Sequence, residues 1–143
     1  MTAPESLKLE NQLCFPLYAA AREVVKQYRP FLDAIDLTYT QYIAMMVLWE
    51  SETASVKELG QRLYLDSGTL TPVVKALETK DLVTRERSAE DERVVMVSLT
   101  DAGRGLMAEA KAVPEQVASC IKLDPADAQQ LYRLLYKLLE AME

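Results

Sequence analysis

Apolar residues recur with the three-and-four spacing of an amphipathic helix along most of the chain. The first such stripe consists of Cys14, Leu17, Tyr18, Ala21, Val24, Val25 and Tyr28. We expect this helix to stop before Pro30, because proline disfavours helical backbone in the residue that precedes it. Pro16 is best tolerated in a first helical turn, which predicts a helix start near residues 11–15 and places Cys14 at the positive end of the helix.

A second helix and a short third helix are expected next, and each begins at a capping box. Thr38 with Gln41, and Ser55 with Glu58, have the spacing at which side chain and backbone cap one helix end reciprocally. A turn over 64–68 then leads to a fourth helix with helical apolar spacing. Its predicted inward positions are Leu70, Val73, Val74 and Leu77, which leaves Gly68, Pro72, Lys75 and Thr79 outward.

The period changes at residues 82–87 and 94–99, two runs rich in β-branched residues around the polar stretch 88–93. These runs predict a hairpin with a charged tip. A helix is expected from Thr100 or Asp101, interrupted near Pro114. The last helix has Asp124 as N-cap and Pro125 at its first position. Its apolar stripe is long for a chain of this size, and consists of Leu131, Leu134, Leu135, Leu138 and Met142.

The third and fourth helices are short, are joined by a tight turn and are followed by a hairpin, which is the order of a winged helix-turn-helix. The expected fold class is therefore mainly α with a small β-hairpin wing. Small and hydroxyl side chains let the start of the fourth helix approach a DNA groove, and an arginine at the hairpin tip suits a narrow minor groove. Asp91 projects to the same side as Arg93 and can orient its guanidinium. The predicted DNA-binding residues are Ser67, Gly68, Thr69, Thr71, Lys75, Arg85, Arg87, Asp91 and Arg93.

The amino-acid composition restricts the kinds of catalytic and metal-binding site that the chain can form. The chain has 143 residues, 50% of them hydrophobic, with two cysteines and no histidine, which fits one domain and excludes imidazole catalysis and histidine-containing zinc sites. We expect no metal and no cofactor.

The N-terminus lacks the apolar core of a signal peptide and no run is long enough to span a membrane, so a cytoplasmic protein is expected. The net charge of −6 argues at first against nucleic acid, and even residues 57–93 carry seven basic against eight acidic side chains. Net charge is a poor discriminator here, because DNA binding depends on where the arginines point.

Four stretches together resemble one known family. They are Leu9-Glu10-Asn11-Gln12-Leu13-Cys14-Phe15, Leu37-Thr38-Tyr39-Thr40-Gln41-Tyr42, the run from Leu63 to Pro72, and Glu90-Asp91-Glu92-Arg93. The chain is similar over roughly residues 7–117 to the MarR family of winged-helix regulators, and within it to the branch that responds to organic hydroperoxides. One departure is Asp81, which stands where the family has a glycine at the end of the fourth helix.

The resemblance implies a homodimeric repressor, not an enzyme, that binds a palindromic double-stranded operator and releases it when an organic hydroperoxide oxidises Cys14. Tyr28 and Tyr39 match tyrosines that reach the thiolate from the other subunit, and Tyr18 matches a neighbouring pocket residue. Cys120 matches the region of a resolving cysteine, whereas a small thiol does this work in one-cysteine members. The expected organisation is a single domain over 1–143, with dimerisation helices over 6–30 and 101–143 and the winged helix-turn-helix over 38–99.

Three other interpretations are compatible with the residues. The first is a regulator of the same fold that is released by a small aromatic ligand, with Cys14 merely lining the pocket. A thiol peroxidase would use Cys14 as a nucleophile, although no arginine lies near it in the sequence. A helical dimerisation module without DNA contacts is the third, and the Asp91–Arg93 hairpin directly after the fourth helix argues against it.

Overall fold

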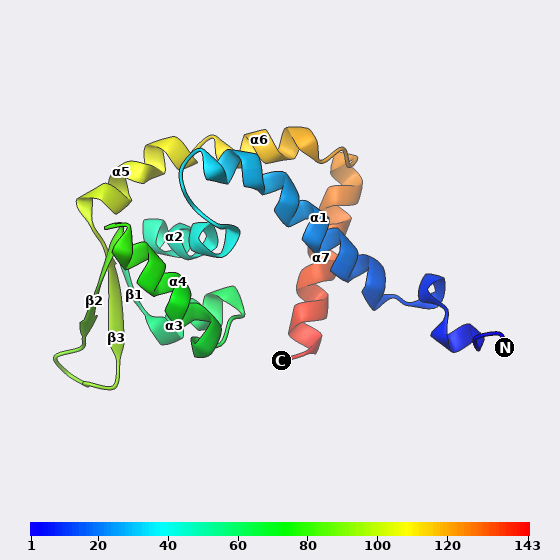
Figure 1. Ribbon diagram of the computed structural model, residues 1–143, viewed down its shortest axis with the longest axis horizontal. Helices are drawn as coiled ribbons and strands as arrows, with labels where there is room; N and C mark the ends of the chain where they lie inside the picture. Colours follow the sequence, from blue (N-terminus) through cyan, green and yellow to red (C-terminus); the bar gives the residue numbers. More distant parts are fainter.

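The computed structural model describes residues 1–143. Two short 3₁₀ turns, η1 (Glu5–Leu7) and η2 (Leu9–Asn11), precede seven helices and three strands (Figure 1). The elements are α1 (Cys14–Asp33), α2 (Tyr39–Ser51), β1 (Thr53–Ser55), α3 (Val56–Leu63), α4 (Ser67–Thr79), β2 (Val83–Arg87), β3 (Val95–Leu99), α5 (Asp101–Ala110), α6 (Val113–Cys120) and α7 (Pro125–Ala141). The mainly helical fold with a small β wing is thus confirmed.

The helix starts follow from local capping. The hydroxyl of Thr38 accepts from the Gln41 amide at 3.3 Å while the Gln41 side chain accepts from the Thr38 amide at 3.1 Å. The same reciprocal pair forms between Ser55 and Glu58 at 3.0 and 3.1 Å, so both predicted capping boxes are confirmed. Each box satisfies amides that the first helical turn would otherwise leave without a partner.

The core lies among α2, α3, α4 and the sheet. Its largest fully buried side chains include Met45, Leu48, Leu59, Leu70 and Leu77. Three of the four predicted inward positions of α4, namely Leu70, Val74 and Leu77, are buried, and Val73 packs against the core from its edge. This packing fixes which face of α4 remains open to solvent.

The wing has one strand more than the sequence predicted. The sheet order is β1-β3-β2, with β3 antiparallel to both neighbours and Ala54 opposite Val97. Residues 53–55 are too few to show a strand period, and they pair because they connect α2 to α3 along the edge of β3. The third strand anchors the base of the hairpin to the helical core.

The predicted end of the first helix is wrong. Helix α1 continues through Pro30 to Asp33, because its last turn places Leu32 in the core, and that burial offsets the backbone hydrogen bond that proline cannot make. The two 3₁₀ turns precede α1, and the Asn11 side chain donates to the Glu5 carbonyl oxygen between them. The helix starts at Cys14, within the predicted range.

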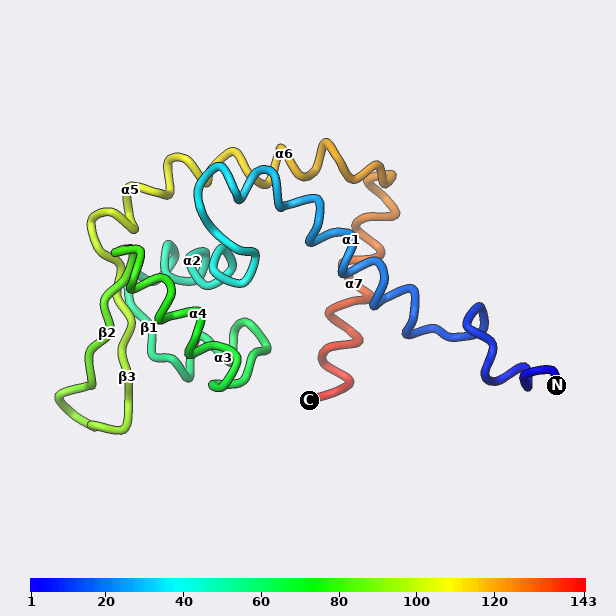
Figure 2. The backbone as a smooth tube through the Cα atoms, viewed as in Figure 1, coloured from blue at the N-terminus to red at the C-terminus, as the bar shows by residue number.

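The remaining helices form an arch beside the winged helix. Helices α5 and α6 run across the top of Figure 2, α6 packs along α1, and α7 turns down from the end of α6. Asp124 and Pro125 occupy the predicted N-cap and first positions of α7, although the Asp124 side chain makes no capping bond. No residue of α7 is buried, and no helix of the chain is long and apolar enough to cross a membrane.

Candidate nucleic-acid interface and thiol site

The turn between α3 and α4 sets the direction of the fourth helix. Tyr64 ends α3 in the left-handed region with φ 56°, and a Cβ on Gly60 would lie only 2.7 Å from the Leu65 carbonyl oxygen. Asp66 then caps α4 by accepting from the Thr69 amide at 2.7 Å, and this hydrogen bond lowers the pKa of Asp66. Sequence reasoning placed residue 66 in the turn and missed its capping role.

The open face of α4 carries the predicted helix contacts. Ser67, Gly68, Thr69 and Lys75 are exposed, and Thr71 is half-buried because its hydroxyl donates to the Ser67 carbonyl oxygen at 2.7 Å. The predicted outward positions Pro72 and Thr79 are exposed as well. Short side chains at the start of this helix leave its backbone accessible to a groove.

The wing tip presents one oriented arginine. The Arg93 side chain is 90% exposed, and its Nε and Nη2 donate to the two carboxylate oxygens of Asp91 at 3.2 Å each. Asp91 also accepts from the Arg93 amide at 3.0 Å, and these hydrogen bonds lower the pKa of Asp91. The predicted guidance of Arg93 by Asp91 therefore exists in the structure.

The other two predicted wing arginines are engaged within the protein. Arg85 donates through Nε and Nη2 to Glu78 of α4 at 3.1 and 3.0 Å, and this hydrogen-bonded pair lowers the pKa of Glu78. Arg87 donates to the Glu92 carbonyl oxygen at 2.7 Å across the hairpin. Both side chains thus fix the wing relative to α4 and to its own tip, in addition to any contact with DNA.

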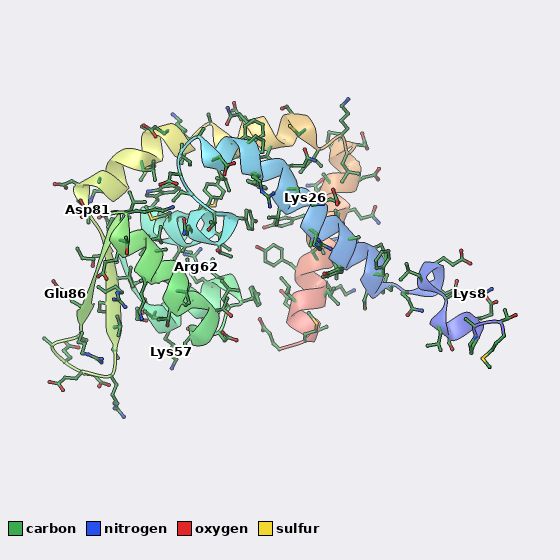
Figure 3. All side chains as sticks on the ribbon, in the orientation of Figure 1. Lys8, Lys26, Lys57, Arg62, Asp81 and Glu86 are labelled. Carbon is green, nitrogen blue, oxygen red and sulfur yellow. The ribbon has the colours of Figure 1, made fainter.

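A groove of ≈ 610 Å³ separates α3, the start of α4 and the wing. Lys57, Arg85 and Arg93 supply its positive charges, and valines form much of its apolar lining. Lys57 projects from α3 at the edge of the molecule toward which the wing extends (Figure 3). Sequence reasoning did not single out Lys57, which the structure places in this groove.

The thiols lie outside this groove. Cys14 is the first residue of α1, and it is exposed and free. One turn on, Tyr18 is 60% exposed, with the Arg22 guanidinium 5.6 Å from its ring centroid. Cys120 ends α6, is also exposed and free, and its thiol contacts the Gln116 carbonyl oxygen at 3.5 Å.

The other predicted pocket residues come together at the opposite end of α1. The rings of Tyr28 and Tyr39 lie 4.9 Å apart edge to face, and Tyr42 lies 5.9 Å from Tyr28. Burial and then the neighbouring Tyr28 raise the pKa of Tyr39, so this phenol remains a neutral hydrogen-bond donor at physiological pH. The structure therefore joins Tyr28 to Tyr39 but leaves Cys14 fourteen residues away along α1, about 21 Å at the helical rise.

Apolar side chains without partners cover both flanking helices. On α7 they are Leu131, Leu134, Leu138 and Met142, and on or near α1 they are Leu13, Phe15, Leu17, Val24 and Val25. Exposed apolar surface of this extent is typical of an interface between subunits.

Comparison with known proteins finds transcriptional regulators similar to this chain. Residues 26–110 match the family of SarA/Rot transcriptional regulators. The chain is 51% identical over 138 residues to the organic hydroperoxide resistance transcriptional regulator of Bacillus subtilis (strain 168), covering 96% of this chain and 94% of that one.

Two solved structures resemble the fold over nearly its full length. Reduced AbfR bound to DNA has a TM-score of 0.78 at 34% identity and covers 97% of this chain and 96% of that one. Disulfide-formed AbfR has a TM-score of 0.61 at 33% identity, with coverage of 96% and 92%. AbfR is a protein of Staphylococcus epidermidis. The chain belongs to the MarR family of winged-helix, DNA-binding transcriptional regulators, on the branch of the organic hydroperoxide resistance regulator.

Proposed function

We propose that this protein is a homodimeric repressor that binds a palindromic operator and releases it when an organic hydroperoxide oxidises Cys14. The observation that carries the proposal is a divided site. An exposed cysteine begins α1, and a pair of phenols, Tyr28 and Tyr39, lies where the same chain cannot bring them to that sulfur. A second subunit packed through the exposed faces of α1 and α7 can bring the two halves together.

For the DNA half, the start of α4 enters the major groove and the wing reaches the adjacent minor groove. Ser67, Gly68, Thr69 and Thr71 offer the close approach, and Lys75 contacts a phosphate. Arg93, held by Asp91, enters the minor groove. Because the two-fold symmetry of a dimer is mirrored by its DNA site, a palindromic operator follows. The family supports this part, since the DNA-bound structure of AbfR shares the fold.

For the redox half, the Cys14 thiolate attacks the distal oxygen of the hydroperoxide. The sulfur–oxygen bond forms as the oxygen–oxygen bond breaks, sulfur is oxidised to a sulfenic acid, and the departing alkoxide takes a proton from solvent or a neighbouring phenol to leave as the alcohol. Tyr28 and Tyr39 of the partner, with Tyr18 alongside, donate hydrogen bonds that hold the thiolate and the developing charge.

The sulfenic acid is then resolved by a second thiol. The thiolate of Cys120 from the other subunit attacks the Cys14 sulfur, a disulfide forms as the sulfur–oxygen bond breaks, and the departing hydroxide takes a proton from solvent to leave as water. Exposure of Cys120 at the end of α6 supports this role, as does the existence of a disulfide form of AbfR. A small thiol performs the same attack if the two cysteines do not meet.

The test is operator binding before and after cumene hydroperoxide, with wild type, Cys14→Ser and Cys120→Ser compared at fixed salt. We expect Cys14→Ser to bind like wild type and to lose release, because serine keeps the shape but not the redox chemistry. Cys120→Ser should still be oxidised, yet lack the dimer band that wild type shows on non-reducing electrophoresis. Release of Cys14→Ser at the wild-type dose would end the sensor proposal, and a wild type that stays monomeric on the gel would assign resolution to small thiols.

A further inference from the structure

Lys80 links α4, the proposed DNA-recognition helix, to α2, which begins at the proposed sensing residue Tyr39. Lys80 is the C-cap residue of α4, and its ammonium donates to the Asp36 carbonyl oxygen and, at 2.9 Å, to Oε1 of Gln41. The Asp36 carboxylate lies 3.7 Å away. These partners are 44 and 39 residues distant in sequence, so the contact ties together two separate parts of the fold.

The acceptor on the other side belongs to the start of α2. Oε1 of Gln41 accepts from the Thr38 amide as well as from Lys80, so one oxygen serves both the capping box and the recognition helix. Gln41 is buried, which fixes its amide in place. Tyr39, the first residue of α2, lies between Thr38 and Gln41, and its ring packs on Tyr28 in the proposed sensing pocket.

The Lys80 ammonium stabilises the arrangement in which the oxygens of Asp36 and Gln41 face the end of α4. A cation is stabilised at the C-terminal end of α4 but not at the N-terminal end of α2, where the helix dipole is positive. The contact therefore depends on the Asp36 and Gln41 oxygens being in place. Asp36 is held in the left-handed region, with φ 54°, in the tight turn between α1 and α2. A small displacement of this turn or of the α2 cap removes the acceptors from Lys80.

We propose that Lys80 is a positioning residue that couples Tyr39 to the end of the recognition helix. When oxidation of the partner's Cys14 displaces Tyr39, the α2 cap shifts, Lys80 loses its acceptors, and α4 leaves the orientation that binds the operator. This inference rests on the proposed function, because it assumes that oxidation at the tyrosine pair controls DNA release.

The test compares Lys80→Met with Lys111→Met, which alters an exposed C-cap lysine of α5. For each protein we would measure operator affinity reduced and oxidised, and the rate of Cys14 oxidation by cumene hydroperoxide. We expect Lys80→Met to be oxidised at the wild-type rate, while its ratio of reduced to oxidised affinity changes by roughly 3- to 10-fold. Lys111→Met should keep the wild-type ratio. A merely structural lysine would alter both affinities together and leave the ratio unchanged, which would overturn the coupling.

A second variant keeps the test decisive if Lys80→Met is poorly folded. Gln41→Glu preserves the capping box and gives Lys80 an anionic partner. It should change the affinity ratio in the wild-type background and not in the Lys80→Met background, and equal changes in both would contradict the coupling. If wild type itself is not released by hydroperoxide, the proposed function fails together with this inference. If wild type is released and every Lys80 and Gln41 variant responds like it, only the coupling fails.

Discussion

The winged helix and the flanking helices bury their apolar residues in different ways. Between Leu37 and Leu99 the chain forms a core in which Met45, Leu48, Leu59 and Leu70 are fully buried. Helix α7, with as clear an apolar stripe, buries no residue at all. The core of the first region forms within one chain, whereas the stripe of α7 has no partner there and is covered by a second copy in the proposed dimer. In the proposed function, a site assembled between subunits is therefore sensitive to chemistry at the interface.

The largest effect should come from a cavity in the self-contained region. Leu48→Ala removes a fully buried side chain of α2, so we expect the free energy of unfolding to fall by about 2–5 kcal/mol. Urea denaturation measures this loss. Met46→Ala, on the same helix but 41% exposed, should cost far less. Similar losses for the two variants would contradict a core within the winged helix that buries Leu48 and leaves Met46 at its surface.

The next effect should appear in association and not in the fold of the winged helix. Leu134→Asp places a carboxylate on the exposed stripe of α7, and we expect it to weaken the dimer by about 2–4 kcal/mol. Sedimentation velocity across a dilution series measures the dissociation constant. Gln129→Asp lies on the opposite face of α7 and serves as the control. A dimer that survives Leu134→Asp unchanged would place the interface elsewhere.

The smallest effect should be confined to the wing. Arg93→Ala removes the exposed guanidinium at the hairpin tip, and we expect operator affinity to fall by on the order of 1–3 kcal/mol with no change in dimer stability. Fluorescence anisotropy at fixed salt measures the affinity, with Lys111→Ala as a charge-matched control far from the wing. An Arg93→Ala protein with wild-type affinity would remove the wing tip from DNA binding.

Local signals in the sequence predicted the self-contained region well. The boxes at Thr38 and Ser55 involve residues three apart, so they are readable from sequence and they fix the starts of α2 and α3. Asp81, where the family has glycine, adopts φ 61° as that position requires. The third strand and the continuation of α1 past Pro30 were not predictable in this way, because both depend on packing between distant segments.

In the candidate sites too, contacts between sequence neighbours were predictable and contacts between distant elements were not. The Asp91–Arg93 pair was predictable because the two residues are neighbours on one hairpin, and the structure contains it. The Arg85–Glu78 pair and the Lys80 contact with Gln41 join different elements, and no sequence spacing indicates them. The tyrosine roles at Cys14 came from family resemblance, and helix length alone showed that Tyr28 must act across subunits if it acts at all.

Mixed dimers test the divided site most directly. A dimer of one Cys14→Ser subunit and one subunit carrying Tyr28→Phe and Tyr39→Phe has a single reactive Cys14, located in the tyrosine-deficient chain. If the tyrosines act across the interface, that cysteine faces intact phenols, and we expect it to be oxidised by cumene hydroperoxide at the wild-type rate. Oxidation as slow as in the Tyr28→Phe/Tyr39→Phe homodimer would show that the phenols serve their own chain, and would contradict a sensor assembled from two subunits.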